Sequence, residues 1–377
     1  LERIQDQCRA FIQNPDSNYM LEIFSQKLKA YGKLSEKDQE QLNLTHKQIL
    51  KEKVLPAYQT LIEGLEQLRG TGKNTGGLVN FSGGKEYYQY LLKSQVGIYI
   101  PVEKLEKRLT QQLSTDSQEI SELLKQHPQL LTLLNEKMDL PDMEPTRVME
   151  LLEKNIQQDF PSTASVDFKI RSVHKSMEEF LSPAFYLTPP MDTGAPNVIY
   201  INHGRQISNL ELFTTLAHEG FPGHLYQTVY FGRQSPSHIR YLIDYSGYVE
   251  GWATYVESYG YEYAASLMKN SAAAKGAVRL AWLNRSMNLC IYSLIDIGIH
   301  YRGWDAARTA AFLKAFGITN ASTANEIYQY IVETPGNYLK YYWGYLSLLD
   351  LRTSEQNRLG QDFDLKKFHS QVLKIGG

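Results

Sequence analysis

The stretch that decides the fold is residues 214–227, which read TTLAHEGFPGHLYQ. A capping box at residues 208–211 predicts that a helix begins there and continues into this stretch. An adjacent His-Glu pair near a second histidine is typical of zinc hydrolases, because neutral imidazoles bind the ion and the carboxylate can accept a proton from water. We therefore interpret His218 and His224 as metal ligands and Glu219 as the general base.

The spacing of the two histidines differs from the usual His-Glu-x-x-His. Histidines four residues apart lie about 40° apart around a helix, whereas His218 and His224 are six residues apart, which corresponds to about 240°. Pro222 cannot donate a backbone hydrogen bond, and Gly223 tolerates the distorted backbone that results. The sequence thus predicts a break between the histidines, and a metal site requires that this break turns His224 back toward His218.

A third ligand is expected from residues 248–257, YVEGWATYVE, which have strong helical periodicity. Glu250 and Glu257 are seven residues apart and share one face of this helix. Zinc peptidases of the His-Glu-x-x-His plus Glu type take their third ligand from a helix that follows the motif. We predict Glu250 as the ligand and Glu257 as a candidate to hydrogen-bond and orient a ligand.

The periodicity of the remaining chain predicts a mainly α fold with a small β-sheet. Amphipathic helices dominate residues 1–160, and helical patterns return from residue 208 to the end of the chain. Three segments between them have the character of short strands: 165–173, 185–190 and 197–202. No linker rich in Pro, Ser or Gly divides the two halves. We therefore expect one continuous catalytic domain over 1–377, with the sheet and the metal-site helices in 161–377.

The composition argues against several other classes of protein. Lys+Arg 39 against Asp+Glu 41 gives a net charge of −2, which is no global signal for binding nucleic acid or an anionic membrane. Cys8 and Cys290 make neither a disulfide framework nor a zinc-thiolate cluster. No apolar run predicts a transmembrane segment, and no Gly-x-Ser-x-Gly motif indicates a serine hydrolase. Since the chain opens Leu-Glu-Arg-Ile, we expect a fragment of a longer chain whose targeting signal lies upstream.

The two stretches with the candidate ligands resemble family 885 of the bacterial domains of unknown function. That family's pattern is His-Glu-x-x-Pro-Gly-His-x-x-Gln followed by Glu-Gly-Trp-Ala-x-Tyr, and this chain has HEGFPGHLYQ at 218–227 and EGWATY at 250–255. Three further stretches match the family: 186–202, 296–304 and 334–352. The N-terminal half matches more loosely. The resemblance therefore covers most of the chain through five ordered motifs.

The resemblance implies a helical, zinc-peptidase-like fold related to the gluzincin peptidases. In such a fold His218, His224 and Glu250 would hold one zinc ion, and Glu219 would be the general base. These four residues match the family's pattern, which argues against an inactive enzyme.

Further site positions follow from the same resemblance. His300 and Tyr341 would donate hydrogen bonds to the tetrahedral oxyanion. Residues with a substrate-binding or supporting role would be Glu257, Gln227, Asn337, Arg352 and Asp296. Asn337 stands where the family commonly has Gln, and the missing methylene would displace or remove a contact with the substrate backbone.

Structural roles are open alternatives for three of these residues. His300 could be a core histidine bonded to Asp296 or to a backbone carbonyl, and Tyr341 could belong to a packing stripe of tyrosines. Arg352 could bind a substrate carboxylate through two hydrogen bonds, or pair with Asp350 or a helix end.

We expect a zinc-dependent hydrolase that cleaves peptide bonds, with oligopeptides as the substrate class. Zinc would lower the pKa of its water toward neutrality, and Glu219 would accept the proton and pass it to the leaving amine. Two alternatives stay open: a zinc hydrolase of another amide or an ester, and a peptide-binding protein without catalysis. Many family members are exported or lipid-anchored, so the resemblance implies a lipoprotein outside the cytoplasm. The sequence indicates neither the oligomeric state nor whether cleavage is internal or terminal.

Overall fold

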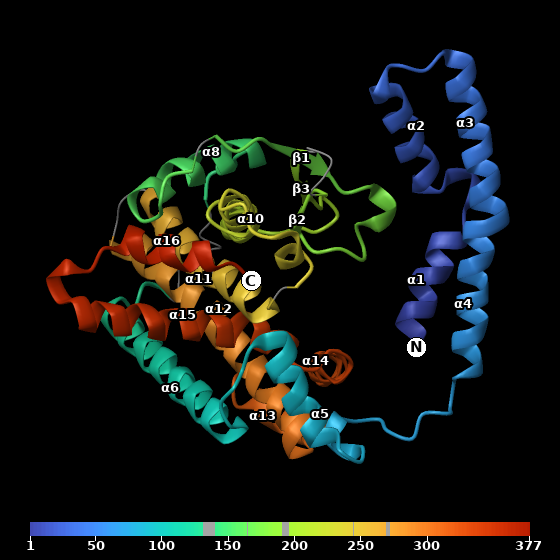
Figure 1. The fold of residues 1–377 in the computed structure, drawn as a ribbon. Helices are drawn as coiled ribbons and strands as arrows, with labels where there is room; N and C mark the ends of the chain where they lie inside the picture. Colours follow the sequence, from blue (N-terminus) through green and yellow to red (C-terminus); the bar gives the residue numbers. More distant parts are fainter. Residues whose placement is uncertain (131–139, 164, 191–195, 244, 269–271) are drawn as a thin grey trace. The chain divides into compact units, whose positions relative to one another are not determined.

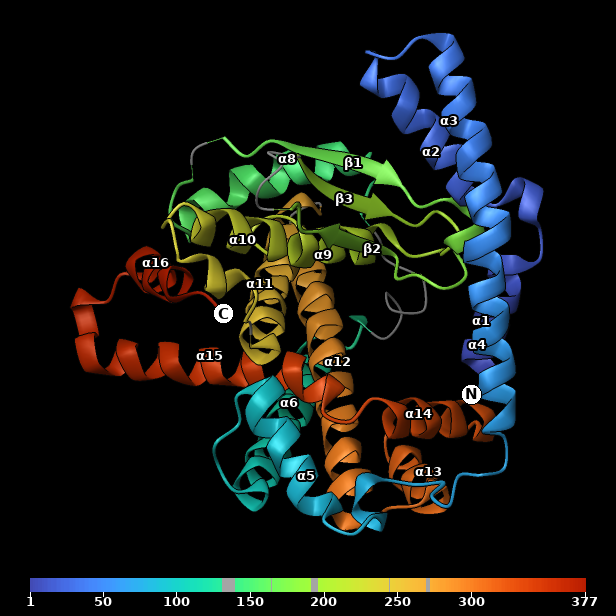
Figure 2. The ribbon, with the colours of Figure 1, turned by 45° about the vertical axis from the view of Figure 1, so that its right-hand side comes forward.

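The computed structural model describes residues 1–130, 140–163, 165–190, 196–243, 245–268 and 272–377. In these residues the fold is mainly helical with a three-stranded sheet, which confirms the predicted fold class at this level (Figures 1 and 2). The chain divides into two compact units: Leu1–Thr75 with Val173–Leu181, and Gly76–Ser172 with Ser182–Gly377. That they form one continuous domain stays a prediction. No helix in the described part is long and apolar enough to cross a lipid bilayer.

The smaller unit is helical. Its elements are α1 (Glu2–Ile12), η1 (Pro15–Ser17), α2 (Tyr19–Tyr31), α3 (Glu36–Ile49), η2 (Leu50–Val54), α4 (Leu55–Gln67) and η6 (Lys175–Met177). The side chains of Asn18 and Ser35 cap α2 and α3 by accepting hydrogen bonds from backbone N–H groups of the first turn. Helix α1 packs on α4, where the buried Gln5 donates to the carbonyl of Ile62 at 3.0 Å.

The larger unit contains the sheet and the helices with the predicted site. Its elements before the motif are η3 (Leu78–Asn80), α5 (Gly84–Leu91), η4 (Leu92–Val96), α6 (Val102–Gln126), α8 (Pro145–Asn155), η5 (Ile156–Gln158), β1 (Phe168–Ser172), β2 (Ala184–Leu187) and β3 (Asn197–Ile201). From the motif onward they are α9 (Asn209–Glu219), α10 (His224–Gly232), η7 (His238–Tyr241), α11 (Ser246–Leu267), α12 (Ala272–Ile297), η8 (Gly298–Arg302), α13 (Ala306–Lys314), α14 (Ala321–Glu333), α15 (Asn337–Leu359), η9 (Gly360–Asp362) and α16 (Leu365–Ile375).

The sheet has the strand order β1-β3-β2, with β1 and β3 parallel and β2 and β3 antiparallel. Each strand overlaps one of the three segments that the sequence predicts as extended. Ile199 of the central strand is fully buried and pairs with Ile170 on one side and with Tyr186 on the other. Strand β2 therefore lies at an edge of the sheet, and it packs beside α9 (Figure 2).

Glycines bring α11 unusually close to two other helices. A Cβ added to Gly251 of α11 would lie 2.5 Å from the Cα of Gly344 on α15. A Cβ added to Gly260 of α11 would lie 2.7 Å from the Cβ of Ala217 on α9. Because larger side chains would push these helices apart, the small residues set the spacing that brings Glu250 of α11 to the end of α9.

Candidate metal centre

The helix break lies where the sequence predicts it, between α9 and α10. The backbone leaves the helical region at Gly220 (φ −109°, ψ −99°) and again at Gly223 (φ −75°, ψ −138°). A Cβ on Gly223 would lie 1.7 Å from the carbonyl oxygen of His218, so this close approach requires glycine. The buried Trp252 of α11 donates a hydrogen bond from Nε1 to the carbonyl of Pro222 at 2.9 Å. The chain is thus turned back over the end of α9 and held there.

The break brings His218, His224 and Glu250 together. One potential ligand atom from each residue lies within 4.8 Å of the other two. The Oε2 atom of Glu250 is 3.5 Å from Nε2 of His218 and 3.5 Å from Nε2 of His224. The two imidazole rings have centroids 4.9 Å apart and planes at 84° to one another, so both nitrogens approach the same point from different directions.

The geometry of this triad fits a zinc ion. Zinc binds nitrogen and carboxylate oxygen at about 2.0–2.2 Å, so two ligand atoms on a tetrahedral ion lie about 3.4 Å apart. Both measured nitrogen–oxygen separations are 3.5 Å, which is longer than a charge-assisted hydrogen bond of about 2.7–2.9 Å. In the described part of the chain, Oε2 of Glu250 is buried without a hydrogen-bond partner. A buried carboxylate oxygen without a partner is costly, and an ion among the three atoms would satisfy it.

Glu257 and Arg285 extend the centre beyond the triad. Glu257 is buried, and its Oε2 lies 3.2 Å from Nδ1 of His218, while Nε of Arg285 on α12 donates to Oε1 at 3.0 Å. Because Nδ1 of His218 faces a carboxylate, Nε2 is left to face Glu250. The structure therefore places Glu257 in the predicted orienting position.

The carboxylates around His218 favour positive charge at this point. Burial alone would lower the pKa of His218, but Glu250 and Glu257 outweigh it and raise the pKa to about 10. Burial alone would raise the pKa of Glu250, yet the two histidines bring it well below its usual value. Burial likewise opposes ionisation of Glu257, and the positive charge of Arg285, joined by His218, lowers its pKa to about 2. The same carboxylates would attract a metal cation, which would bind in competition with the proton on His218.

Glu219 lies beside the triad on the wall of a cleft. It is the last residue of α9, and its Oε2 accepts a hydrogen bond from the backbone N–H of Tyr186 in β2 at 2.8 Å. The cleft has a volume of about 930 Å³, and residues from α6, α9, α11, α12, α15 and the segment before β2 line it, with His218 among them. The edge strand thus holds one oxygen of Glu219, and among the described residues the other oxygen has no hydrogen-bond partner and could accept from a water molecule.

Tyr341 of α15 lines the same cleft. Its ring centroid is 6.3 Å from that of His218, and the two rings are inclined by 25°. Burial, with the charges of Glu250 and Glu219, raises the pKa of its hydroxyl, which therefore stays protonated at neutral pH and can donate a hydrogen bond. The structure brings Tyr341 to the site as the family resemblance implies.

His300 is not brought to the site. It is fully buried in η8, where Nδ1 accepts a hydrogen bond from the N–H of Leu78 at 3.1 Å and Nε2 lies 2.8 Å from the carbonyl of Ile331. Neither ring nitrogen can donate to a substrate, and His300 does not line the cleft. The expected role in binding an oxyanion has no support in this geometry, which matches the alternative of a core histidine bonded to a backbone carbonyl.

Asp296 is likewise part of the protein interior. The hydroxyl of Tyr88 donates to Oδ1, and the N–H of Gly336 donates to Oδ2 at 2.8 Å. Burial raises the pKa of the Asp296 carboxyl to about 7. Both oxygens bond to protein groups, so the structure does not support a role at the metal centre.

Arg352 forms its hydrogen bonds with two tyrosines of α11. One of its guanidinium nitrogens donates to the hydroxyls of Tyr255 at 3.2 Å and Tyr259 at 2.9 Å. Asp350, the alternative partner, forms an ion pair with Arg108 at 2.8 Å instead. The structure joins Arg352 to an aromatic cluster and does not place it among the residues that line the cleft.

The two predicted amide residues lie outside the cleft as well. Gln227 is buried in the first turn of α10, where its backbone N–H donates to the carbonyl of Gly223 at 2.9 Å. Asn337 begins α15, and its backbone N–H donates to the carbonyl of Thr334 at 3.2 Å. Neither side chain lines the cleft.

Sequence reasoning missed two contributors to the site, Arg285 and the backbone N–H of Tyr186. Arg285 lies 28 residues after its partner Glu257, and Tyr186 lies 33 residues before Glu219. A backbone N–H is present whatever the side chain, so the sequence could not indicate this donor. Arg285 is one of three basic residues of α12, with Lys275 and Arg279, so the sequence gives no specific signal for its role.

The fold and this arrangement can be compared with known proteins. The family described as "Bacterial protein of unknown function (DUF885)" matches residues 1–377. The chain belongs to the DUF885 family. No curated protein is significantly similar to this DUF885 chain.

Two solved structures resemble this DUF885 chain in fold. One is described as "the putative lipoprotein from Colwellia psychrerythraea", with a TM-score of 0.82 and 22% identity, over 99% of this chain and 66% of that one. The other is a "putative lipoprotein of unknown function from Shewanella oneidensis", with a TM-score of 0.60 and 18% identity, over 99% of this chain and 71% of that one. At these identities the likeness shows a shared fold. The chain spans about two thirds of the length of these relatives.

Proposed function

We propose that this protein is a zinc-dependent hydrolase that cleaves peptide bonds in oligopeptides. The observation that carries the proposal is the buried, unpartnered Oε2 of Glu250 at 3.5 Å from two imidazole nitrogens, beside a carboxylate that faces a cleft. His218, His224 and Glu250 would hold the ion. Two histidines from one motif and a glutamate from a following helix are the ligand set of the gluzincin peptidases, which the motifs resemble.

The chemistry divides among a few side chains. A zinc ion held by the triad would supply a Lewis acid that lowers the pKa of water and polarises the substrate carbonyl. Glu219 accepts the proton of the attacking water and delivers it to the leaving amine. Tyr341 donates a hydrogen bond to the negative charge that develops on the carbonyl oxygen. Glu257 holds His218 in the tautomer and orientation that binding requires.

An extended peptide suits the shape of the site. The strand nearest Glu219 is the edge strand β2, and a cleft of about 930 Å³ is large enough for a few residues of substrate. The alternatives are hydrolysis of another amide or an ester, and peptide binding without catalysis. A substrate panel with zinc present separates all three.

We also propose that the protein works outside the cytoplasm as an exported or lipid-anchored protein. The support is that both structural relatives are described as putative lipoproteins. Fractionation of cells that express the protein from its native gene tests this directly.

The first experiment is the metal content of the purified chain, measured by elemental analysis beside a His224→Ala variant. We expect about one zinc per chain, lost in the variant, because the 3.5 Å geometry needs both imidazoles. The matched control is His174→Ala, which removes a histidine of the smaller unit bonded to Glu22 and should leave the zinc content unchanged. Absence of metal in the parent chain after zinc is supplied would reject the zinc hydrolase and leave the peptide-binding alternative.

A further inference from the structure

Arg285 has an unused hydrogen-bonding edge in the catalytic cleft. It is the single Lys or Arg among the described residues that line this cleft. Its Nε donates to Glu257 at 3.0 Å, and within the described residues its two terminal nitrogens form no hydrogen bond. The side chain is 40% exposed, so these nitrogens are open to the cleft. The planar guanidinium is the donor that proteins use to bind a carboxylate through two parallel hydrogen bonds.

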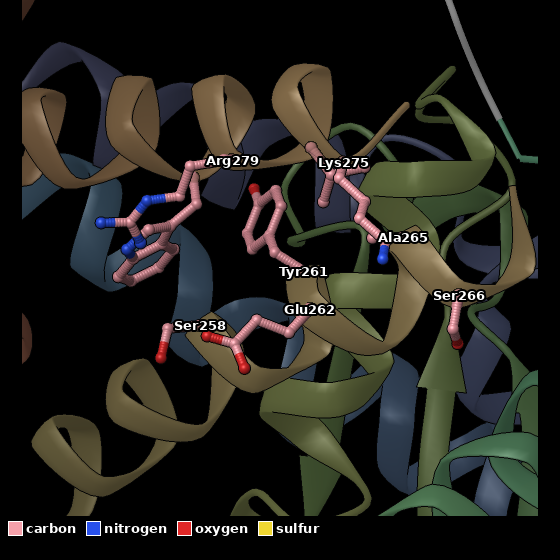
Figure 3. A pocket seen from close by; sticks show the side chains of 9 residues that line it. Ser258, Tyr261, Glu262, Ala265, Ser266, Lys275 and Arg279 are labelled. Carbon is pink, nitrogen blue, oxygen red and sulfur yellow. The ribbon is translucent and has the colours of Figure 1, made fainter. Parts of the chain in front are cut away.

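Arg279 differs from Arg285 because it forms a two-bond ion pair with a carboxylate of the protein. Arg279, six residues earlier on α12, binds both oxygens of Glu119 through Nε at 2.5 Å and a terminal nitrogen at 2.7 Å. Arg279 lies along a separate pocket of about 460 Å³ that Tyr261 and Glu262 also line (Figure 3). In contrast, Glu257 gives only one oxygen to Arg285, because its other oxygen faces His218. The fork of Arg285 is therefore left for a second anion.

Two amides stand beside this fork. Asn284 and Asn288 line the cleft from α12, and Asn288 lies three residues from Arg285 and thus on the same helix face. Neither amide forms a hydrogen bond with another described residue. An arginine fork with neighbouring amide donors is a receptor for a carboxylate.

The receptor lies close to the reacting atoms. A single carboxylate, that of Glu257, separates the Arg285 guanidinium from His218, and each of the two contacts is at most 3.2 Å. One extended residue spans about 3.3–3.6 Å, so the gap corresponds to one or two residues of peptide. We propose that Arg285, with Asn288, binds the free C-terminal carboxylate of the substrate, and that the enzyme removes one or two residues from the C-terminus. This inference rests on the proposed peptidase function and specifies its substrate class.

The test uses two oligopeptides of one sequence, one with a free C-terminal carboxylate and one with a C-terminal amide. We compare the zinc-loaded parent chain with Arg285→Gln, and Arg279→Gln on the same helix is the matched control. The parent chain should cleave the acid with a kcat/KM about 10- to 100-fold above that of the amide, and mass spectrometry should find loss of one or two C-terminal residues. Arg285→Gln should lose this preference, mainly through KM for the acid, and Arg279→Gln should keep it.

A structural role for Arg285 predicts a different pattern. If Arg285 only positions Glu257, the substitution lowers turnover of acid and amide by the same factor, and the proposal is overturned. Internal or N-terminal cleavage overturns it as well, although the proposed peptidase function would stand. Asn288→Asp serves as a second variant that leaves the Arg285–Glu257 contact in place. Its added negative charge should weaken cleavage of the acid and spare the amide, and equal effects on both would count against the receptor.

A binding experiment separates this inference from the proposed function. Zinc-loaded Glu219→Gln, which lacks the general base, is titrated with both peptides by calorimetry, alone and combined with Arg285→Gln. Preference for the acid that disappears in the double variant supports carboxylate recognition even if the parent chain cleaves neither peptide. Equal affinity for acid and amide in Glu219→Gln overturns it. Failure of the parent chain to cleave any peptide would reject the peptidase function alone.

Discussion

His218 and His300 are both buried in the larger unit, and each has a carboxylate nearby. The two clusters differ in whether all their polar atoms form hydrogen bonds. His300 in η8 has both ring nitrogens bonded to backbone groups, and both oxygens of the neighbouring Asp296 accept hydrogen bonds. At the motif, Glu250 approaches two imidazole nitrogens at 3.5 Å, and its Oε2 has no hydrogen-bond partner in the described residues. In the described residues, the ring nitrogens and carboxylate oxygens of the first cluster are all hydrogen-bonded, whereas the second cluster contains a carboxylate oxygen without a partner.

The comparison teaches which buried polar group indicates a ligand. A buried polar atom is normally bonded, because leaving it without a partner costs about 1–3 kcal/mol. Such an atom calls for an explanation, and an ion or a water molecule that bonds to it is one. Burial alone does not mark the candidate site, because His300 and Asp296 are fully buried while His224 and Glu250 are only partly buried. The count of hydrogen-bonded atoms distinguishes the two clusters.

The largest effect is expected at the general base. Glu219→Gln keeps the size of the side chain and can still accept from the N–H of Tyr186, but it cannot take a proton from water. We expect a fall in kcat on the order of 10²–10⁴-fold with zinc content unchanged, measured by peptide hydrolysis and elemental analysis. A variant that kept its rate would show that the mechanism assigned to the motif is wrong.

The next largest effect should appear in folding stability at His300. His300→Ala leaves the N–H of Leu78 and the carbonyl of Ile331 without their partner, so the free energy of unfolding should fall by about 2–5 kcal/mol in urea titrations. The zinc content should not change. His224→Ala, studied without metal, should cost less than half as much, because in the described residues no hydrogen bond is lost at Glu250. Equal losses in the free energy of unfolding for His300→Ala and His224→Ala would contradict the proposed difference between the two clusters.

Much of the candidate metal centre was predictable because its residues are close in sequence. The break at Pro222-Gly223 follows from the chemistry of two adjacent residues, and the shared helix face of Glu250 and Glu257 follows from helical periodicity alone. The mainly α fold and the three short strands were predictable for the same reason.

The remainder depended on contacts between distant segments. Arg285 and the backbone of Tyr186 reach the site only because α12 and β2 pack beside α9 and α11, and no local pattern states that packing. The predicted role of His300 in catalysis has no support in the geometry, for the converse reason. A matching motif shows which residue occupies a position but not which groups that residue contacts. The ring nitrogens of His300 contact backbone groups of Leu78 and Ile331.

A smaller effect is expected at Glu257, which contacts both the candidate ligand His218 and Arg285 of α12. Glu257→Gln can still accept from Nδ1 of His218 but removes the negative charge that orients and polarises the imidazole. We expect zinc affinity to fall about 10- to 100-fold in competition titrations against a chelator. Glu262→Gln, an exposed carboxylate five residues later on α11, is the matched control and should bind zinc as the parent does. Unchanged affinity in Glu257→Gln would confine the centre to its three ligands.

A pH dependence is expected at the cluster of His300 and Asp296, where no metal is involved. Burial raises the pKa of Asp296 to about 7 in the folded chain, above the ordinary value of 3.8, although Tyr88, Gly336 and Lys340 partly oppose the shift. Below about pH 4 the carboxyl is protonated in both states and costs nothing. Between about pH 4 and 7 only the unfolded chain ionises, so stability falls as pH rises, by up to about 1.4 kcal/mol per pH unit.

Asp296→Asn isolates this contribution, because the amide resembles the protonated carboxyl and does not titrate. The difference in free energy of unfolding between the parent chain and the variant should therefore shift in favour of the variant from pH 4 to pH 7 and then level off. The measurement is urea unfolding at fixed pH values in the presence of a chelator, so that zinc contributes to neither chain. If the two curves stay parallel across this range, the pKa of Asp296 is the same in the folded and unfolded chain. The hydrogen bonds from Tyr88 and Gly336 would then fully offset the effect of burial on the carboxylate.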